Sequence, residues 1–135
     1  MNIKFFKNIF LVSFISFAFF ALSPVETGVF FENIKDGQKV SSPFLVKMKV
    51  IGKTVAQAGD PAPNTGHHHI IVDGTFMEQG EIIPADATHI HYGKGQTEAE
   101  LSLPKGLHTL TLQFADMNHL SFGQDWSRTV KIEVE

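Results

Sequence analysis

The sequence predicts an all-β protein, an immunoglobulin-like antiparallel β-sandwich of about seven strands that follows an N-terminal signal peptide. Three observations lead to this fold class. Short β-branched segments alternate with turn signals, no segment after the leader has a convincing helical pattern, and two segments alternate strictly between apolar and polar residues. A chain of 135 residues has room for one such domain.

Residues 1–27 are predicted to be a secretory signal peptide. Lys4 and Lys7 precede an almost continuous apolar run over residues 9–22, which is the order of a signal peptide. The run is shorter than the about 20 apolar residues of a membrane span, so we expect no membrane anchor after cleavage. The cleavage position stays open, with Thr27 as one candidate. The mature domain is expected to comprise residues 28–135 and to be periplasmic or secreted.

The strands of this domain are expected to be short and separated by turns. Val46, Met48 and Val50 alternate with Lys47 and Lys49, the pattern of a half-buried strand. Asp73-Gly74 is expected to form a hairpin turn, and residues 75–85 are ambiguous, with a possible strand at 80–83. Residues 40–43 are expected to be an extended link and residues 53–66 a loop. The expected strands are, in chain order, 29–31, 44–52, 68–72, 87–92, 98–103, 108–115 and 129–135.

Charge and cysteine content limit the possible functions. The chain has 11 basic and 14 acidic residues and a net charge of −3, so it offers no electrostatic basis for binding nucleic acid. It contains no cysteine, so an exported form would have no disulfide. A metal ion would therefore have to be held by histidine, carboxylate or methionine side chains.

The histidines are the main candidates for a binding site. All seven lie between His67 and His119, and two His-x-His pairs stand out, His67 with His69 and His89 with His91. Residues i and i+2 of a strand point to the same face, with Cα atoms about 6.5 Å apart. Each pair can therefore direct two imidazoles at one ion. His119 could complete such a site from a loop, and imidazole ligands suit copper and zinc.

Other histidines have simpler interpretations. His108 shares strand parity with Leu110 and Leu112, so we assign it a structural role. His68 lies on the opposite face of its strand from His67 and is expected to point inward. A histidine flanked by apolar residues is in general more often a hydrogen-bonded structural residue than a ligand. The histidines as a group could therefore form a polar network without any metal.

Three segments together resemble a known family. They are Gly66 to Asp73 (GHHHIIVD), His89 to Glu98 (HIHYGKGQTE) and Gly106 to Leu110 (GLHTL). This combination resembles an uncharacterised family of bacterial exported domains of unknown function, some members of which are labelled rod-shape-determining protein. The resemblance implies a periplasmic or secreted all-β domain without an established activity. In the family pattern another histidine follows the segment that matches Asp116 to His119, whereas Leu-Ser-Phe-Gly follows it here.

These observations predict an exported domain that binds a small ligand. The expected ligand is a transition-metal ion, copper or zinc, and no other cofactor is expected. The alternative is a non-metal binding or interaction module of the cell envelope with a structural histidine network. No nucleophile or catalytic motif is recognised, so we expect no enzymatic activity. The predicted metal ligands are His67, His69, His89, His91 and His119.

Overall fold

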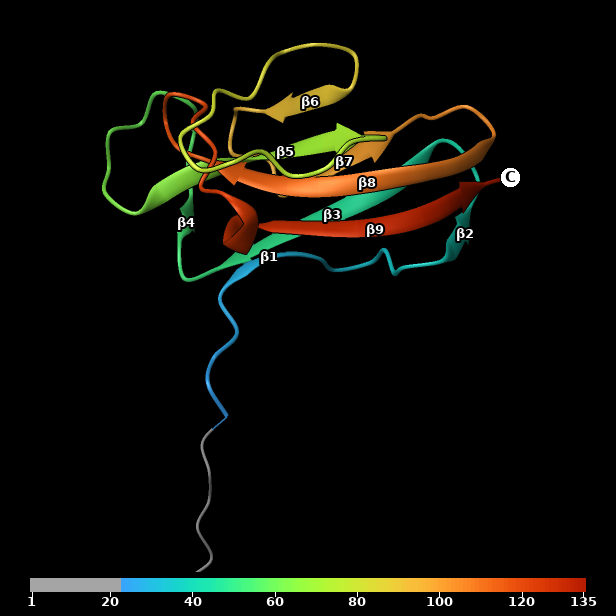
Figure 1. The fold of residues 1–135 in the computed structure, drawn as a ribbon, viewed down its shortest axis with the longest axis horizontal. Coiled ribbons are helices and arrows are strands. Elements are labelled where there is room, and N and C mark those ends of the chain that lie inside the picture. Colours follow the sequence, from blue (N-terminus) through green and yellow to red (C-terminus); the bar gives the residue numbers. More distant parts are fainter. Residues whose placement is uncertain (1–22) are drawn as a thin grey trace, which may run out of the picture.

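The computed structural model describes residues 23–135, which form two β-sheets packed face to face (Figure 1). The prediction of an all-β sandwich is confirmed. The predicted signal peptide lies almost entirely in residues 1–22, outside the described residues. The one helical element among residues 23–135 is a 3-10 turn, Gln124–Trp126, and no described helix is long and apolar enough to cross a membrane.

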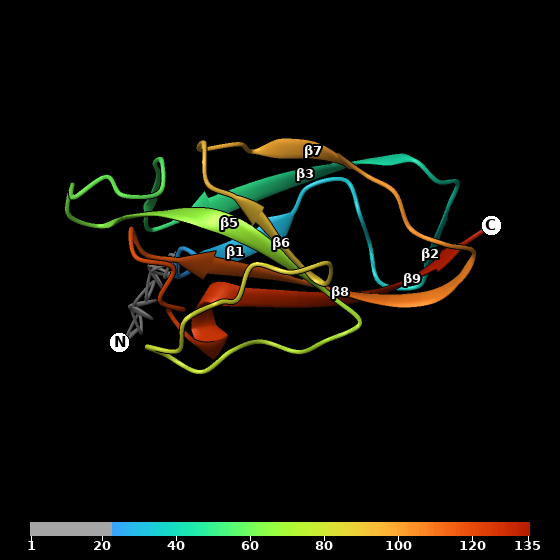
Figure 2. The same cartoon turned by 90° about the horizontal axis from the view of Figure 1, so that it is seen from above.

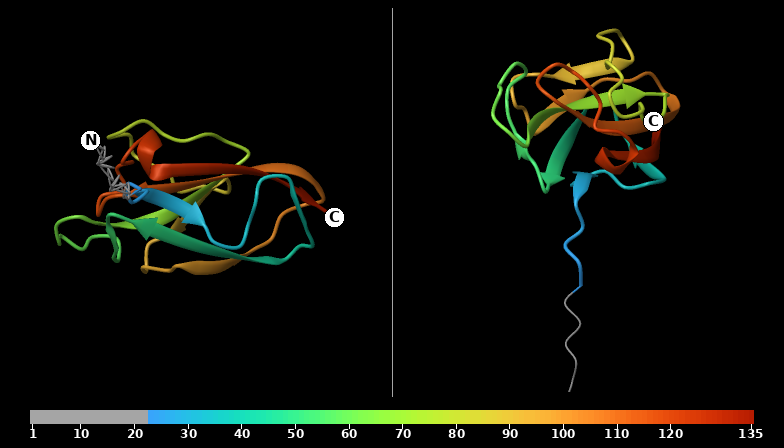
Figure 3. Two further views of the ribbon diagram at one scale, coloured as in Figure 1. Left: turned by 90° about the horizontal axis from the view of Figure 1, so that it is seen from below. Right: turned by 60° about the vertical axis from the view of Figure 1, so that its left-hand side comes forward.

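The smaller sheet contains three strands in the order β1-β3-β7, which the left panel of Figure 3 shows from below. Their bounds are Gly28–Phe31, Phe44–Ile51 and Glu98–Leu101, and both pairs are antiparallel. The predicted alternation in β3 is confirmed, because Val46 and Met48 are buried in the core and the lysines between them are exposed.

The larger sheet has the order β2-β9-β8-β5-β4, and β6 pairs with β5 beside β4. These strands are Gln38–Val40, Ser127–Val134, Gly106–Ala115, Thr65–Val72, Thr54–Val55 and His89–Tyr92. Residues 23–135 thus form nine strands, two more than predicted. β4 lies inside the predicted loop 53–66, and β2 overlaps the predicted link 40–43 only at Val40. Both are short and pair in parallel, whereas the other pairs are antiparallel.

Strand β5 is buried on both faces. On the inner face, Ile70 and Val72 join the core together with Leu110, Leu112 and other side chains of both sheets. At its start, β5 passes close to β8, and a Cβ on Gly66 would lie 2.3 Å from the carbonyl oxygen of Ala115. β5 also begins earlier than predicted, so that the whole histidine run lies inside the strand.

Two connections lie on the outer side of the larger sheet, and Figure 2 shows the longer one, in yellow-green, running along the side that faces away from β3 and β7. They are residues 73–88 and 116–123, and backbone hydrogen bonds join them to each other. The Ile83 N–H donates to the His119 carbonyl at 2.9 Å, and an isolated bridge pairs Ile82 with Leu120. The predicted two-residue hairpin at Asp73-Gly74 is therefore wrong. The chain continues through the long connection 73–88 before β6 returns along β5, and the expected strand at 80–83 is reduced to this single bridge.

Candidate metal centre

The period of two residues in β5 separates the three consecutive histidines. His67 and His69 lie on the outer face beside His119 of the connection 116–123, and His68 points into the sandwich core, where its ring meets Phe114 edge-on. All three side chains are buried, with relative exposures of 0%, 0% and 1%. The predicted division of the run into two outer histidines and one inner histidine agrees with this arrangement.

Strand β6 brings a third imidazole to the same face. Its register with β5 places His91 directly opposite His69, so the two side chains are cross-strand neighbours. The rings of His67 and His69 are each centred 5.0 Å from the ring of His91. The sheet pairing alone therefore gathers three histidines from two strands.

The fourth imidazole comes from the connection between β8 and the 3-10 turn. The His119 ring is centred 5.0 Å from that of His67 and 4.7 Å from that of His91. Two pairs of ring nitrogens lie in close contact: the Nε2 atoms of His67 and His69 are 3.0 Å apart, and those of His91 and His119 are 3.1 Å apart.

Three of these histidines lie close enough together to hold a metal ion. His67, His91 and His119 each offer one ring nitrogen, and the three nitrogens lie within 4.8 Å of one another. His69 extends this group through its contact with His67. We refer to His67, His69, His91 and His119 as the histidine cluster.

The loop that carries His119 is ordered by Asp116. Its Oδ1 accepts the N–H of Asn118 at 2.8 Å and that of Leu120 at 2.9 Å, and its carbonyl accepts the N–H of His119 at 3.0 Å. His119 itself has φ 67°, a left-handed conformation that costs energy in residues other than glycine. The hydrogen bonds around Asp116 hold the loop in this conformation and thereby direct His119 at the cluster.

Gly93 makes room for the His91 ring. A Cβ at position 93 would lie 2.2 Å from both Cε1 and Nε2 of His91, far inside van der Waals contact. The imidazole therefore lies over the glycine backbone, and only a residue without a side chain permits that position.

Burial keeps three imidazoles of the cluster, those of His67, His69 and His91, neutral. Desolvation, with the neighbouring histidines as the second cause, lowers the pKa of His67 to about 4 and that of His69 to about 2. The pKa of His91 is lowered as well, by desolvation and then by His119. A neutral imidazole has the free electron pair that a metal ion requires, so these rings are held in the form that binds metal at neutral pH.

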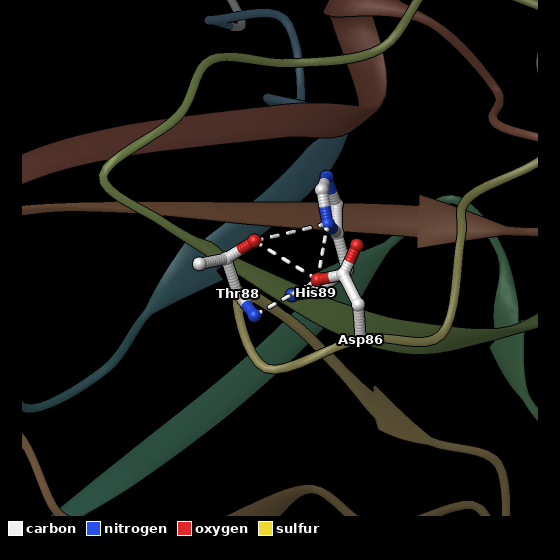
Figure 4. A network of polar contacts seen from close by, with 3 residues as sticks. All are labelled: Asp86, Thr88 and His89. Atoms are coloured by element: carbon white, nitrogen blue, oxygen red, sulfur yellow. Dashed lines mark hydrogen bonds and ion pairs between the residues drawn. The ribbon is translucent and has the colours of Figure 1, made fainter.

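The structure does not bring the fifth predicted ligand, His89, into the cluster. His89 lies opposite Ile71 on β5, and its Nδ1 is 2.8 Å from Oδ1 of Asp86 (Figure 4). His108 is also remote. Its ring lies between a carboxylate oxygen of Asp73 at 2.9 Å and the carbonyl of Pro104 at 2.8 Å, in accordance with a structural role.

Sequence reasoning missed Asp116 and Gly93 as supporting residues. The Asp-x-x-His spacing was visible, and an aspartate three residues before a histidine in a loop is a signal for a turn that positions the histidine. The short distance between His91 and Gly93 gave no such signal, because a glycine after a strand is in most cases a turn residue.

The fold and the histidine cluster define a β-sandwich domain with a candidate metal centre between its strands β5 and β6 and a loop. Over residues 46–135, which include every residue of the cluster, the sequence matches the family described as domain of unknown function DUF4399. The chain belongs to this family. Searches of curated proteins and of solved structures found no match to the chain.

Proposed function

We propose that this protein is an exported domain that binds one transition-metal ion, copper or zinc, through His67, His69, His91 and His119. The observation that carries the proposal is the convergence of four imidazoles from β5, β6 and the loop at 116–123. Apart from the pair His67 and His69, the four histidines are far apart in the sequence, so only the fold brings them together. Their ring centres are all within 5.9 Å of one another.

The environment of the buried rings supports the same proposal. Nδ1 of His67 and Nδ1 of His69 are buried without a hydrogen-bond partner, which in general costs about 1–3 kcal/mol for each group. If the rings had only a structural role, their unpaired nitrogens would lower the stability of the fold without any compensation. An ion bound by the Nε2 atoms of both rings, which face each other at 3.0 Å, would leave the proton of each neutral ring on Nδ1, and its binding free energy would offset this cost.

The ligand chemistry favours Cu(II) or Zn(II). The four candidate ligands are imidazoles without thiolate or thioether, a set that suits these borderline ions better than Cu(I). Two nitrogens bound at about 2.0–2.1 Å to one ion are about 3.0 Å apart at right angles and about 3.4 Å apart at the tetrahedral angle. The contacts of 3.0 Å and 3.1 Å require only small ring movements to reach either geometry.

Export remains part of the proposal. The lysines and the apolar run in residues 1–22 support a signal peptide, and a cell fractionation of the tagged full-length chain tests it. Recovery of a shortened protein in the periplasm or medium is expected. A full-length protein that stays in the cytoplasm would contradict export without affecting metal binding.

Calorimetric titration of the purified, untagged domain with Cu(II) and Zn(II) tests the binding proposal. We expect one ion for each chain, and strongly reduced binding in the double variant H91Q/H119Q. The variant H108Q is the control, because the same His-to-Gln change removes an imidazole that lies outside the cluster. If the wild type binds neither ion, or if the double variant binds as well as the wild type, the histidines form a structural network and the alternative function stands.

A further inference from the structure

His89 is the one histidine of β6 that the cluster does not use. We propose that His89 is an outer, transient ligand that takes the metal ion from solvent and transfers it to His91. The inference rests on the proposed function and deepens it, since it concerns how an ion reaches the histidine cluster.

Asp86 fixes the orientation of the His89 ring. One carboxylate oxygen, Oδ1, accepts the Thr88 N–H at 2.9 Å, the Thr88 hydroxyl at 2.9 Å, the His89 N–H at 3.0 Å and the His89 Nδ1–H at 2.8 Å (Figure 4). These hydrogen bonds, that of the His89 ring first among them, hold the pKa of Asp86 well below its usual range. The ring is therefore anchored by a stable carboxylate.

The same contact determines which ring nitrogen can bind a metal. A carboxylate oxygen only accepts hydrogen bonds, so Nδ1 carries the proton and Nε2 of the neutral ring has the free electron pair. This carboxylate–histidine arrangement is the one that orients and strengthens imidazole ligands in metal sites. Within residues 23–135, Nε2 of His89 has no hydrogen-bond partner.

The position of His89 is suited to a transfer step. It lies two residues before His91 in β6, so both side chains leave the strand on the same face, with Cα atoms about 6.5 Å apart. Their partners on β5, Ile71 and His69, keep the same spacing. His89 is thus beside the cluster and outside it.

Exposure across the site indicates the direction from which an ion arrives. His67 and His69 are buried, His119 is partly buried, and His91 is exposed. The β6 side is therefore the open side of the cluster. His89, whose side chain is 22% exposed, lies on the same strand two residues from the more exposed His91. A hydrated ion that arrives on this side therefore meets both imidazoles and can exchange a water ligand for Nε2 of His89 while it is still outside the cluster.

This role has a kinetic signature. A ligand that is absent from the final complex accelerates binding and release equally, so its removal slows both rates and leaves the equilibrium constant unchanged. A ligand of the final complex would instead weaken the equilibrium binding, mainly through faster release. The two roles of His89 can thus be distinguished by measuring rates and affinity together.

The experiment is stopped-flow mixing of Cu(II) with the untagged domain. Quenching of the fluorescence of Trp126, the single tryptophan, reports binding, and a competing chelator reports release. For H89Q we expect both rates to fall by about threefold or more, with Kd changed by less than about twofold. H108Q is the control, because it removes another carboxylate-bound imidazole on a different strand and should leave both rates unchanged.

The possible results separate this inference from the proposed function. If wild type does not bind Cu(II), the proposed function fails. If wild type binds and H89Q has unchanged rates, the transfer role is wrong while the metal site stands. A large loss of affinity in H89Q would also overturn the transfer role, because it would make His89 a ligand of the final complex.

Discussion

The Nε2 atoms of His91 and His119 lie 3.1 Å apart, although 28 residues separate the two histidines in the chain. His91 owes its position to the pairing of β6 with β5, and His119 owes its position to a loop that Asp116 holds together. The contact therefore depends on two independent parts of the fold, and each part can be disturbed separately.

Substitution of Asp116 tests the loop. D116A removes the acceptor for the Asn118 and Leu120 N–H groups, and each lost hydrogen bond should cost about 0.5–1.5 kcal/mol of unfolding free energy. With the loop loosened, we expect affinity for Cu(II) or Zn(II) to fall about tenfold or more, in the range seen for residues that support metal ligands. D116N keeps an oxygen acceptor and should retain most of the affinity. Equal losses in D116A and D116N would contradict a role based on these hydrogen bonds.

Substitution of Gly93 tests the position of His91. In G93A the new methyl group takes the space of the imidazole, 2.2 Å from its Nε2. Because His91 is exposed, the ring can swing into solvent, and we expect unfolding free energy to change by less than about 1 kcal/mol. Metal affinity should nevertheless fall about tenfold or more. Chemical denaturation and calorimetric titration of the same sample give the two quantities, and unchanged affinity would show that His91 does not need this position.

The buried histidines should make the metal-free protein sensitive to acid. In the unfolded chain a histidine protonates near pH 6.5, whereas the pKa values of His67 and His68 in the fold are about 4 and that of His69 is about 2. Between these values the unfolded chain binds more protons, so stability is full above pH 6.5 and decreases as the pH falls. The decrease is at most about 1.4 kcal/mol per pH unit for each such histidine. Denaturant unfolding between pH 7 and pH 5 measures it, and a flat profile would contradict it.

His68 allows this effect to be separated from metal binding. Neither of its ring nitrogens has a hydrogen-bond partner among residues 23–135, and it faces the core, away from the cluster. We expect H68L to raise the unfolding free energy at pH 7 by about 1–3 kcal/mol, because it removes buried polar atoms that nothing satisfies. H68L should also weaken the dependence of stability on pH between pH 7 and pH 5 while leaving metal stoichiometry at one. A destabilised H68L protein would indicate that His68 has a function in the core that its contacts do not reveal.

His108 should contribute to stability with the opposite dependence on pH. Its two ring nitrogens face two acceptors, Asp73 and Pro104, which favours the doubly protonated ring. The hydrogen bond to Asp73, as the largest cause, raises the pKa of His108. Its stabilising effect is therefore full below pH 6.5 and is lost as the pH rises through the raised pKa. H108Q should lower the melting temperature more at pH 6 than at pH 8.5, and an equal loss at both would contradict an imidazolium contact.

The sequence was sufficient to predict the fold class, the parity of the histidine run and the family. Alternation in β3 follows directly from burial of one strand face, so it is visible in residue order. In β8, residues 110–115 are buried on both faces, and the alternation is visible because the outer face carries the polar Thr111 and Gln113. The position of His89 was not predictable in the same way. Strand parity places His89 on the same face as His91, but the register between β6 and β5 decides which residue of β5 lies opposite it. That partner is Ile71, and a local carboxylate, Asp86, holds the ring there.

The loop at Asp116 and the two strands that pair in parallel, β2 and β4, show a second limit of prediction from the sequence. β2 and β4 are three and two residues long, too short for any periodic pattern to indicate a strand. They form because β9 and β5 offer them free edges, which is a tertiary effect. The connection 73–88 was likewise expected to begin as a tight hairpin, but three of its backbone hydrogen bonds join it to residues 119 and 121, far away in the chain.

The chain has no cysteine, and the histidine cluster suggests what replaces a disulfide in it. An ion bound by His67, His91 and His119 would be a removable crosslink between β5, β6 and the loop after β8, and it would close two long segments of chain at once. Closing such loops stabilises a fold by restricting the unfolded chain, and binding adds stability that grows with ion concentration. The stiffness of this face would then be set by the supply of metal around the protein, and not by the redox state of its compartment.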